Sequence, residues 1–348
     1  MQCDLLSVRD LGFSYADEET LKGIGLDVGR GEFVALMGPN GSGKTTTMRC
    51  MNQILKGTGT VTIDGTDMSA LQMSEIARIC TTVPADTSTD FVLSVRDFVS
   101  LGRSPFVTNL WWEGDEDTEI IDRAMRSLDL ERYADRRLSE LSSGERARVL
   151  LAKGMAQTPK VMLVDEPSAH LDIKYKVQIM EILSALSRTG LGIVIASHDV
   201  NLITRFCDRI LLLSEGRIVA YGRPADVVTV ESVREVFGID VEIVRSGGVP
   251  YILPTGSTGF ELNGLRGPPL PPSGRTASGR FYLLYYIDMK SWTVHAHVMH
   301  CKSITGVCFV LFRVAVEEVP HPLCRCRLPV PSAMNVSPIG SSRHPIRP

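Results

Sequence analysis

The sequence predicts an α/β fold with a mainly parallel sheet core, an N-terminal antiparallel β subdomain and a helical subdomain. Three observations predict it. Apolar runs of strand length alternate with helical patterns through the first 256 residues. Turns rich in Gly and Asp divide the beginning of the chain into short strands, and the pattern between Leu71 and Glu140 is mainly helical. Residues 1–256 are therefore interpreted as one domain, with its helical subdomain at about 71–157.

The strands are placed by their composition. Buried parallel strands appear as continuous apolar runs, since both faces of such a sheet are covered. The runs expected in the parallel sheet are Phe33 to Met37, Val161 to Val164, Gly192 to Ala196 and Arg209 to Leu213. The runs expected in the antiparallel region are Leu5 to Val8, Gly23 to Val28 and Thr60 to Ile63, the last followed by a hairpin turn.

Composition limits the kinds of partner. The chain has 348 residues, of which 44% are hydrophobic and 22% charged, as in a soluble globular protein. A net charge of -3 argues against a nucleic-acid partner held by bulk electrostatics. No run approaches the roughly 20 apolar residues that span a bilayer, and the start lacks the features of a secretion signal. A cytoplasmic location is expected, with reduced and mostly buried thiols at Cys3, Cys50, Cys80 and Cys207.

A glycine-rich segment follows the first predicted parallel strand and fits the pattern of a phosphate-binding loop. It precedes a helical run from Thr45 to Leu55, so that backbone N–H groups converge on phosphates at a helix N-terminus. Lys44 would neutralise phosphate charge, and the Thr45 hydroxyl would hold Mg²⁺. The residues expected to bind the nucleotide here are Gly38, Pro39, Asn40, Gly41, Ser42, Gly43, Lys44, Thr45 and Thr46.

Two carboxylates, Asp165 and Glu166, follow the predicted strand at Val161 to Val164. They should lie at the carboxyl edge of the parallel sheet, beside the phosphate-binding loop. Asp165 would support Mg²⁺, and Glu166 would orient or deprotonate the attacking water. Such a pair also serves as a helix cap or turn, but its position after a phosphate-binding loop favours catalysis.

The segment Leu141 to Glu145 opens a helical run that continues to Ala156. Its small residues predict a helix N-terminus that binds an anion, although a plain N-cap also fits. The segment resembles the signature sequence of ABC ATPases, whose fold is that of P-loop NTPases. Ser143 replaces the first of two usual glycines, and Glu145 stands where Gln or Glu is common. The resemblance implies nucleotide contacts by Ser142, Ser143, Gly144 and Glu145.

Further positions match motifs of this family in the expected order. Tyr15 matches the aromatic residue that stacks on adenine, although it also fits a core or edge aromatic. The segment Ser168 to Asp172 resembles the loop that couples two subunits. Within it, His170 is interpreted as a residue that forms hydrogen bonds inside the loop. His198 matches the switch histidine after a strand, although it also fits a hydrogen-bonded histidine without a catalytic duty. The resemblance makes His198 catalytic together with Glu166.

Within the family, the chain resembles the ATP-binding subunits of iron-chelate (siderophore), haem and cobalamin importers. The resemblance rests on Val99 to Pro105, His170 to Tyr175 and Leu213 to Gly222. It implies an ATPase with ATP and Mg²⁺ as cofactors. One position departs from the family, which usually carries Gln after the strand near residues 79–83, whereas this chain has Ala85. Slow or weakly coupled hydrolysis is expected if Ala85 occupies that position.

The resemblance also implies the partners. Two copies would pair head to tail as a homodimer, with ATP between Lys44 of one and Gly144 of the other. Transmembrane permease subunits would dock in a groove of the helical region 71–140, where Trp111 and Trp112 either contact them or pack internally. An extracytoplasmic binding protein would act indirectly, and no nucleic acid is involved. The chain would lie on the inner face of the cell membrane.

The composition changes after residue 256. The remaining 92 residues hold eleven of the nineteen prolines and five of the seven histidines. Residues 257–280 resemble a linker rich in Pro and Gly, and residues 281–348 form a C-terminal extension of unknown function. The extension is interpreted as disordered or frameshift-derived, with two apolar stretches, Phe281 to Ile287 and Ser303 to Val316, able to pair as strands. The alternative is a metal site among His295, His297, His300, Cys301, Cys308, Cys324 and Cys326.

Two other functions stay open at this point. The first is a soluble ABC ATPase of translation or DNA repair. It is disfavoured because only 97 positions separate Lys44 from Leu141, which leaves no room for the long coiled-coil insertion of such proteins. The second is a nucleotide-binding regulator with weak turnover, which Ala85 allows and the intact Asp165, Glu166 and His198 disfavour.

Overall fold

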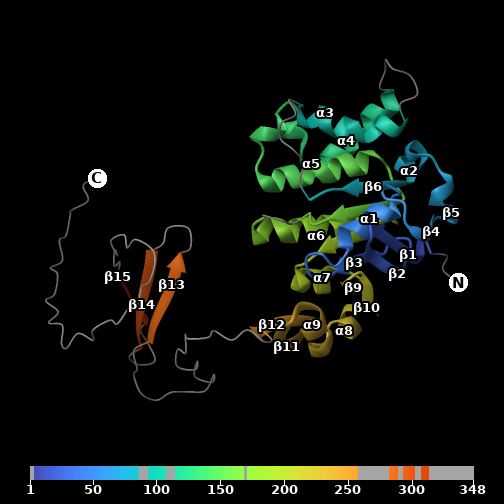
Figure 1. The fold of residues 1–348 in the computed structure, drawn as a ribbon. Coiled ribbons are helices and arrows are strands. Elements are labelled where there is room, and N and C mark those ends of the chain that lie inside the picture. Colours follow the sequence, from blue (N-terminus) through green and yellow to red (C-terminus); the bar gives the residue numbers. More distant parts are fainter. Residues whose placement is uncertain are drawn as a thin grey trace, which may run out of the picture. The chain divides into compact units, whose positions relative to one another are not determined.

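The computed structural model describes residues 4–85, 93–106, 114–167 and 171–257, together with the backbone of three strands within 282–312. The chain divides into two compact units, Met1–Glu261 and Leu262–Pro348 (Figure 1). The first unit contains the α/β fold that the sequence predicts, and the second contains the three strands.

A six-stranded sheet forms the centre of the first unit, with the strand order β10-β9-β3-β8-β7-β6. All neighbouring pairs are parallel except β10 with β9, which form an antiparallel hairpin. The four strands predicted for this sheet are confirmed. The strands are β3 (Phe33–Met37), β6 (Cys80–Val83), β7 (Val161–Asp165), β8 (Gly192–Ser197), β9 (Arg209–Ser214) and β10 (Arg217–Gly222).

A second sheet is antiparallel, with the order β2-β1-β4-β5, as predicted for the N-terminal region. The turn between β4 and β5 has Asp64 at φ 52° and Gly65 at φ 77°. These positive angles suit the tight hairpin that an Asp-Gly pair favours. The strands are β1 (Leu6–Tyr15), β2 (Glu18–Val28), β4 (Thr58–Ile63) and β5 (Thr66–Asp67).

Two hydrophobic cores lie on the two faces of the parallel sheet because successive side chains of a strand point to opposite faces. In β3, Phe33 and Met37 belong to one core and Leu36 to the other. The second core also contains Met48 and Met51 of helix α1 (Lys44–Met51), together with apolar side chains of the antiparallel sheet. Burying each such side chain contributes about 1.5–3 kcal/mol, so the position of α1 against β7 and the antiparallel strands β1 and β2 is firmly held.

Helices α3, α4 and α5 lie side by side at one end of the first unit (Figure 1). Local signals define their starts. Ser94 caps α3 by accepting a hydrogen bond from the Asp97 N–H at 3.1 Å, and the first turn of α4 is acidic, which favours the positive end of the helix dipole. The α-helices after α1 are α2 (Met73–Ile79), α3 (Val95–Ser100), α4 (Asp115–Ser127), α5 (Ser143–Ala156), α6 (Ile173–Ser187), α7 (Val200–Phe206), α8 (Pro224–Val227) and α9 (Val230–Phe237). The 3₁₀ helices are η1 (Met68–Ala70), η2 (Leu101–Phe106), η3 (Glu131–Tyr133) and η4 (Leu138–Glu140).

A two-stranded hairpin closes the first unit. It consists of β11 (Ile239–Ser246) and β12 (Val249–Ser257), joined by Gly247 and Gly248, which both have positive φ. Strand β12 packs against α7. Because Ser257 pairs with Ile239, the expected boundary at residue 256 falls one residue before the end of the hairpin.

The second unit contains a three-stranded antiparallel sheet of β13 (Tyr282–Asp288), β14 (Thr293–Cys301) and β15 (Val307–Phe312). The expected pairing of the two apolar stretches with each other was wrong, since each stretch pairs with β14. Strand pairing uses backbone groups that every residue carries except the proline N–H, so the histidine-rich β14 can separate them. The side chains of the candidate metal ligands lie outside the described part of the structure.

Three cysteines of the first unit, Cys50, Cys80 and Cys207, are buried and free. Burial raises the thiol pKa of Cys50 to about 11 and that of Cys80 to about 12. The prediction of reduced, buried thiols is confirmed for these three, while Cys3 lies outside the described residues. Among the helices described, none is long and apolar enough to cross a membrane.

Candidate active site

The phosphate-binding loop joins β3 to α1 and depends on glycines for its shape. Gly41 and Gly43 have φ of 81° and 100°, where a side chain is strained. A Cβ atom on Gly38 would lie 2.2 Å from the carbonyl oxygen of Leu213, so only glycine fits there. Lys44 Nζ donates hydrogen bonds of 2.9 Å to the carbonyl oxygens of Gly38 and Pro39. The backbone of the loop therefore forms a tight turn, a cradle in which the Lys44 side chain lies against the carbonyl groups at its start.

Two features of this cradle fit a bound phosphate. The hydroxyl of Ser42 is buried and has no hydrogen-bond partner within the described part of the chain, which is costly unless a ligand satisfies it. The first N–H groups of α1 have no partner inside the helix and carry its positive dipole end. Burial lowers the pKa of Lys44, and the nearby Glu166 and Asp165 partly oppose this shift.

Asp165 and Thr45 meet at the carboxyl edge of the sheet, as predicted. Thr45, the second residue of α1, donates its hydroxyl proton to Asp165 Oδ2 at 2.8 Å. Burial is the main cause that raises the pKa of Asp165, and the neighbouring Glu166 raises it further, while Thr45, Arg49 and Lys44 lower it. A hydroxyl and a carboxylate are hard oxygen ligands of the kind Mg²⁺ prefers, so the pair fits this ion.

Glu166 and His198 form the second pair of the site. Glu166 has φ 43° and donates its N–H to the Ala196 carbonyl oxygen at 2.9 Å. The left-handed conformation costs a non-glycine residue about 1 kcal/mol or more. It directs the chain so that Glu166 Oε2 lies 3.4 Å from His198 Nδ1. A carboxylate and an imidazole at this separation are suited to hold and activate one water molecule.

The loop that carries His198 begins where β8 ends. Ser197 Oγ accepts a hydrogen bond from the Asp199 N–H at 3.1 Å. Asp199 then caps α7 by accepting from the Leu202 N–H at 3.4 Å, and Lys176 Nζ lies 3.4 Å from the same carboxylate. His198 itself is 58% exposed in its side chain, so its environment is open.

The signature-like segment forms the N-terminus of α5. Ser142 is the N-cap, and its N–H and hydroxyl both donate to Glu145 Oε2 at 2.8 Å, which makes a capping box. The nearby Tyr133 hydroxyl, followed by the Ser142 N–H, lowers the pKa of Glu145 to about 2. Ser142 and Ser143 are exposed, and no hydrogen bond among the described residues joins this segment to the phosphate-binding loop.

Gly144 has a packing reason that the sequence did not reveal. A Cβ atom there would lie 2.5 Å from Cδ1 of the Tyr175 ring, which belongs to α6. The glycine therefore lets α5 approach α6 closely. Tyr133 and Tyr175 were missed as supporting residues because each acts across the fold and belongs to no linear motif.

The remaining predicted residues have varied settings. Tyr15 ends β1, is 46% exposed and stacks edge-to-face on Phe13 with ring centroids 4.8 Å apart. Strand β1 pairs with β2, and β2 contacts the phosphate-binding loop. The Leu21 side chain of β2 lies so close to Gly43 that a Cβ atom there would be 2.7 Å away. Asp172 is the N-cap of α6, and Thr46 is buried in α1. Asn40 is exposed in the loop.

Ala85 is exposed two residues after β6. Val83, the last residue of β6, pairs with Val164 of β7, so Ala85 follows the strand next to Asp165. Several motif residues cannot be placed: Ser168, His170, Trp111 and Trp112 lie outside the described residues.

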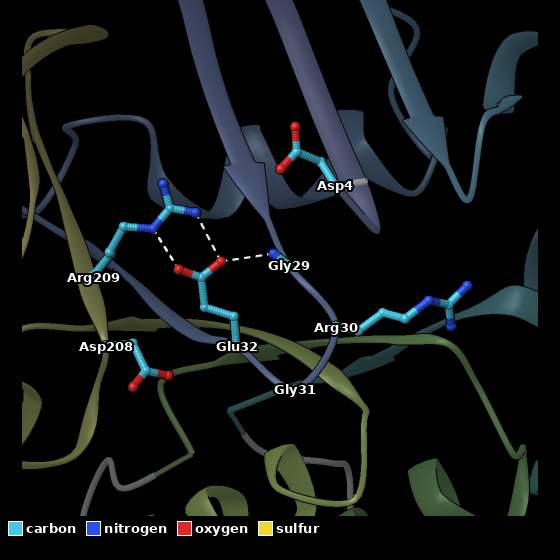
Figure 2. Close-up of a pocket in the computed structure, with 7 residues that line it drawn as sticks. All are labelled: Asp4, Gly29, Arg30, Gly31, Glu32, Asp208 and Arg209. Atoms are coloured by element: carbon cyan, nitrogen blue, oxygen red, sulfur yellow. Dashed lines mark hydrogen bonds and ion pairs between the residues drawn. The ribbon is translucent and has the colours of Figure 1, made fainter. Parts of the chain in front are cut away.

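A separate cavity of about 400 Å³ lies at the opposite, amino-terminal edge of the sheet (Figure 2). Arg209 and Glu32 line it and form a double hydrogen bond of 2.5 and 2.7 Å, and Glu32 also accepts from the Gly29 N–H at 2.6 Å. Arg209 in addition donates to the Asp27 carbonyl oxygen at 2.6 Å. The charges of Arg209 and Glu32 are therefore paired with each other. We interpret the cavity as a gap where the two sheets meet, separate from the reactive site.

The fold and the phosphate-binding loop with its carboxylates define a P-loop nucleotide-binding protein. A family model described as "ABC transporter" matches residues 21–169. A cobalamin import ATP-binding protein of Halobacterium salinarum is 36% identical over 68% of this chain and 60% of its own length. A hemin import ATP-binding protein of Rhizobium meliloti is 35% identical over 73% of this chain and 100% of its own length. The solved structure of cbiO1 from Clostridium perfringens, part of the ABC transporter complex cbiONQ, matches 67% of this chain and 93% of that chain at 31% identity, with a TM-score of 0.59.

The chain belongs to the ABC transporter ATP-binding family, and the predicted resemblance to ATP-binding proteins of haem and cobalamin import is confirmed. It is an ATP-binding ATPase of that family.

Proposed function

We propose that this chain is the motor subunit of an importer for an iron–siderophore, haem or cobalamin, working as a head-to-tail homodimer that encloses two MgATP. The proposal rests on one observation, which is that the residues expected to bind ATP lie in two separate places on the chain. Lys44, Asp165 and Glu166 gather at the sheet edge, whereas Ser142 and Ser143 are exposed at the start of α5. A second copy can supply the α5 N-terminus to the phosphates held by the first.

The roles of the chain's own residues follow from their positions. Lys44 and the N–H groups of the loop would neutralise the phosphates. Thr45 and Asp165 would hold Mg²⁺, which when bound neutralises charge that develops on the phosphates. Glu166 would accept the proton of the attacking water, and His198, 3.4 Å away, would orient that water. Tyr15 would stack on adenine through its exposed ring.

Permease subunits are proposed to dock on the helical subdomain. Two elements there contact each other, because Arg78 of α2 donates to the Pro105 carbonyl oxygen of η2 at 2.9 Å. Met73 of α2 and Leu101 of η2 are 54% and 43% exposed. Exposed apolar side chains on adjoining elements suit a protein partner. The import relatives at 35–36% identity support this assignment and a place on the inner face of the cell membrane, with an external binding protein acting indirectly.

The test of the proposal is Glu166→Gln in the full chain. This change keeps the size of the side chain but removes the base, so the variant should bind ATP and form a stable dimer without turning over. Sedimentation with and without MgATP measures the dimer, and phosphate release measures turnover. Full hydrolysis by the variant would exclude Glu166 as the base, and a monomer at saturating MgATP would exclude the enclosed dimer.

The alternatives make different predictions. A soluble ABC ATPase would gain no activity from permeases, and a regulator would bind ATP with little turnover in either condition. Turnover measured with and without reconstituted permeases separates them.

The C-terminal extension is tested by truncation. A chain ending at Glu261 keeps the whole β11–β12 hairpin, whereas a cut at residue 256 removes a paired strand residue. Loss of ATPase activity or of bound metal on removing 262–348 would identify the extension as a working domain.

A further inference from the structure

The side chain of Asn201 pairs with the backbone of the C-terminal hairpin. Its Nδ2 donates to the Ile252 carbonyl oxygen at 3.2 Å, and its Oδ1 accepts from the Ile252 N–H at 2.9 Å. The amide thus satisfies both backbone groups of one residue in β12, as a neighbouring strand would. Ile252 is only 8% exposed and belongs to the main hydrophobic core, so the hairpin is a fixed support at this point.

Asn201 lies three residues after His198, in the first turn of α7. The same turn also contacts α6. Asp199 caps α7, and its carboxylate lies 3.4 Å from Lys176 Nζ of α6. Two anchors therefore hold the start of α7, one to α6 and one to the hairpin. Since His198 is joined to this turn through Asp199 and Val200, the anchors also limit where its backbone can move.

A cavity of about 280 Å³ lies between His198 and the hairpin, bordered by Asn201, Ile252 and Pro254. The imidazole is 58% exposed and its described polar contact is Glu166 at 3.4 Å. Because both groups must contact the same water molecule at about 2.6–3.2 Å, a small displacement of the imidazole matters. With a cavity on one side and little packing, the position of the imidazole depends on how firmly its backbone is held.

We propose that Asn201 is a positioning residue for hydrolysis, which holds the His198 loop in place by fastening α7 to the β11–β12 hairpin. The inference rests on the role proposed above for His198. It gives the hairpin a part in the hydrolytic step, although no hydrogen bond or ion pair among the described residues joins the hairpin to Glu166.

The test compares Asn201→Ala with Tyr251→Phe in the full chain. Arg205 donates to the Tyr251 hydroxyl at 3.4 Å, so Tyr251→Phe also removes a hydrogen bond between α7 and β12, but at the far end of the helix from His198. We expect Asn201→Ala to lower kcat for ATP about 10-fold or more with little change in KM, since a misplaced catalytic group affects the chemical step. Tyr251→Phe should leave kcat within about twofold of the wild-type value.

Two further measurements make the result decisive. Amide hydrogen exchange of residues 197–203 should accelerate in Asn201→Ala and not in Tyr251→Phe. Asn201→Asp keeps the shape and the acceptor for the Ile252 N–H but sets a carboxylate oxygen against the Ile252 carbonyl oxygen, so kcat should fall as in Asn201→Ala, and this isosteric variant tests the inference even if the alanine variant fails to fold.

His198→Ala, measured alongside, separates the role of His198 from that of Asn201. Normal turnover of His198→Ala would remove the proposed role of His198 and the inference with it. If His198→Ala is inactive but the Asn201 variants have the kcat of Tyr251→Phe, only the inference is overturned and Asn201 is a structural residue.

Discussion

Thr45 donates a hydrogen bond of 2.8 Å to Asp165, a residue 120 positions further along the chain. The contact exists because β3 and β7 both flank β8 and end at the same edge of the sheet. It brings the start of α1 and the end of β7 into one oxygen-rich position, where Mg²⁺ is proposed to bind.

Replacing Asp165 by Asn tests this metal position. The amide can still accept the hydrogen bond of Thr45 but lacks the charge that favours a divalent cation. We expect turnover to fall on the order of 100-fold and to need more Mg²⁺. A Mg²⁺ titration of ATPase activity measures both. As a control, Asp64→Asn removes a carboxylate that pairs with Arg30 and Lys160 on the surface, and its Mg²⁺ dependence should be unchanged. An unaltered Mg²⁺ dependence in Asp165→Asn would argue against the assignment.

Ala85→Gln should raise transport-linked turnover. Position 85 follows the strand beside Asp165. If Ala85 stands where the family carries Gln, the site lacks a polar group that senses the γ-phosphate. ATPase activity with and without permeases measures the coupling. Ala85→Met is the matched control, because its unbranched side chain has the length of Gln without the amide and should produce no gain. If Gln and Met behave alike, the missing amide does not limit coupling.

Gly144→Ala should destabilise the chain through a clash with Tyr175. The new Cβ would lie 2.5 Å from the ring, and overpacking of this kind costs about 1–3 kcal/mol. Denaturant unfolding measures the loss. In a Tyr175→Ala background the same change should cost much less, because the ring is gone. Equal costs in both backgrounds would show that the ring does not explain the glycine.

Glu145 makes stability depend on pH. Its pKa is lowered from 4.5 to about 2, chiefly by the Tyr133 hydroxyl and the Ser142 N–H. A folded-state pKa below the unfolded one stabilises the fold above pH 4.5, and this contribution is lost as the pH falls toward 2. Tyr133→Phe should therefore be less stable than wild type at neutral pH, with the difference shrinking at about pH 3. Thermal unfolding at both pH values measures it, and a difference that stays constant with pH would show that the Tyr133 hydroxyl does not lower the pKa of Glu145.

Much of the fold was predictable because its signals are local. The apolar runs that form β3, β7, β8 and β9 were identified, since strands buried on both faces must be apolar throughout. The phosphate-binding loop was predictable for the same kind of reason, because a short segment contains both its glycines and its lysine. In the extension, apolar character alone indicated two strands and missed β14, which pairs with both.

The sequence by itself determined the α/β architecture, the phosphate-binding loop and the order of the motifs from Tyr15 to His198, because each depends on neighbouring residues. Only the tertiary structure decided which side chains support them. Tyr133 reaches Glu145 and Tyr175 requires Gly144, while Asn201 binds Ile252 across 51 positions. Such contacts depend on how helices and strands pack in three dimensions, and no local pattern of residues records that packing.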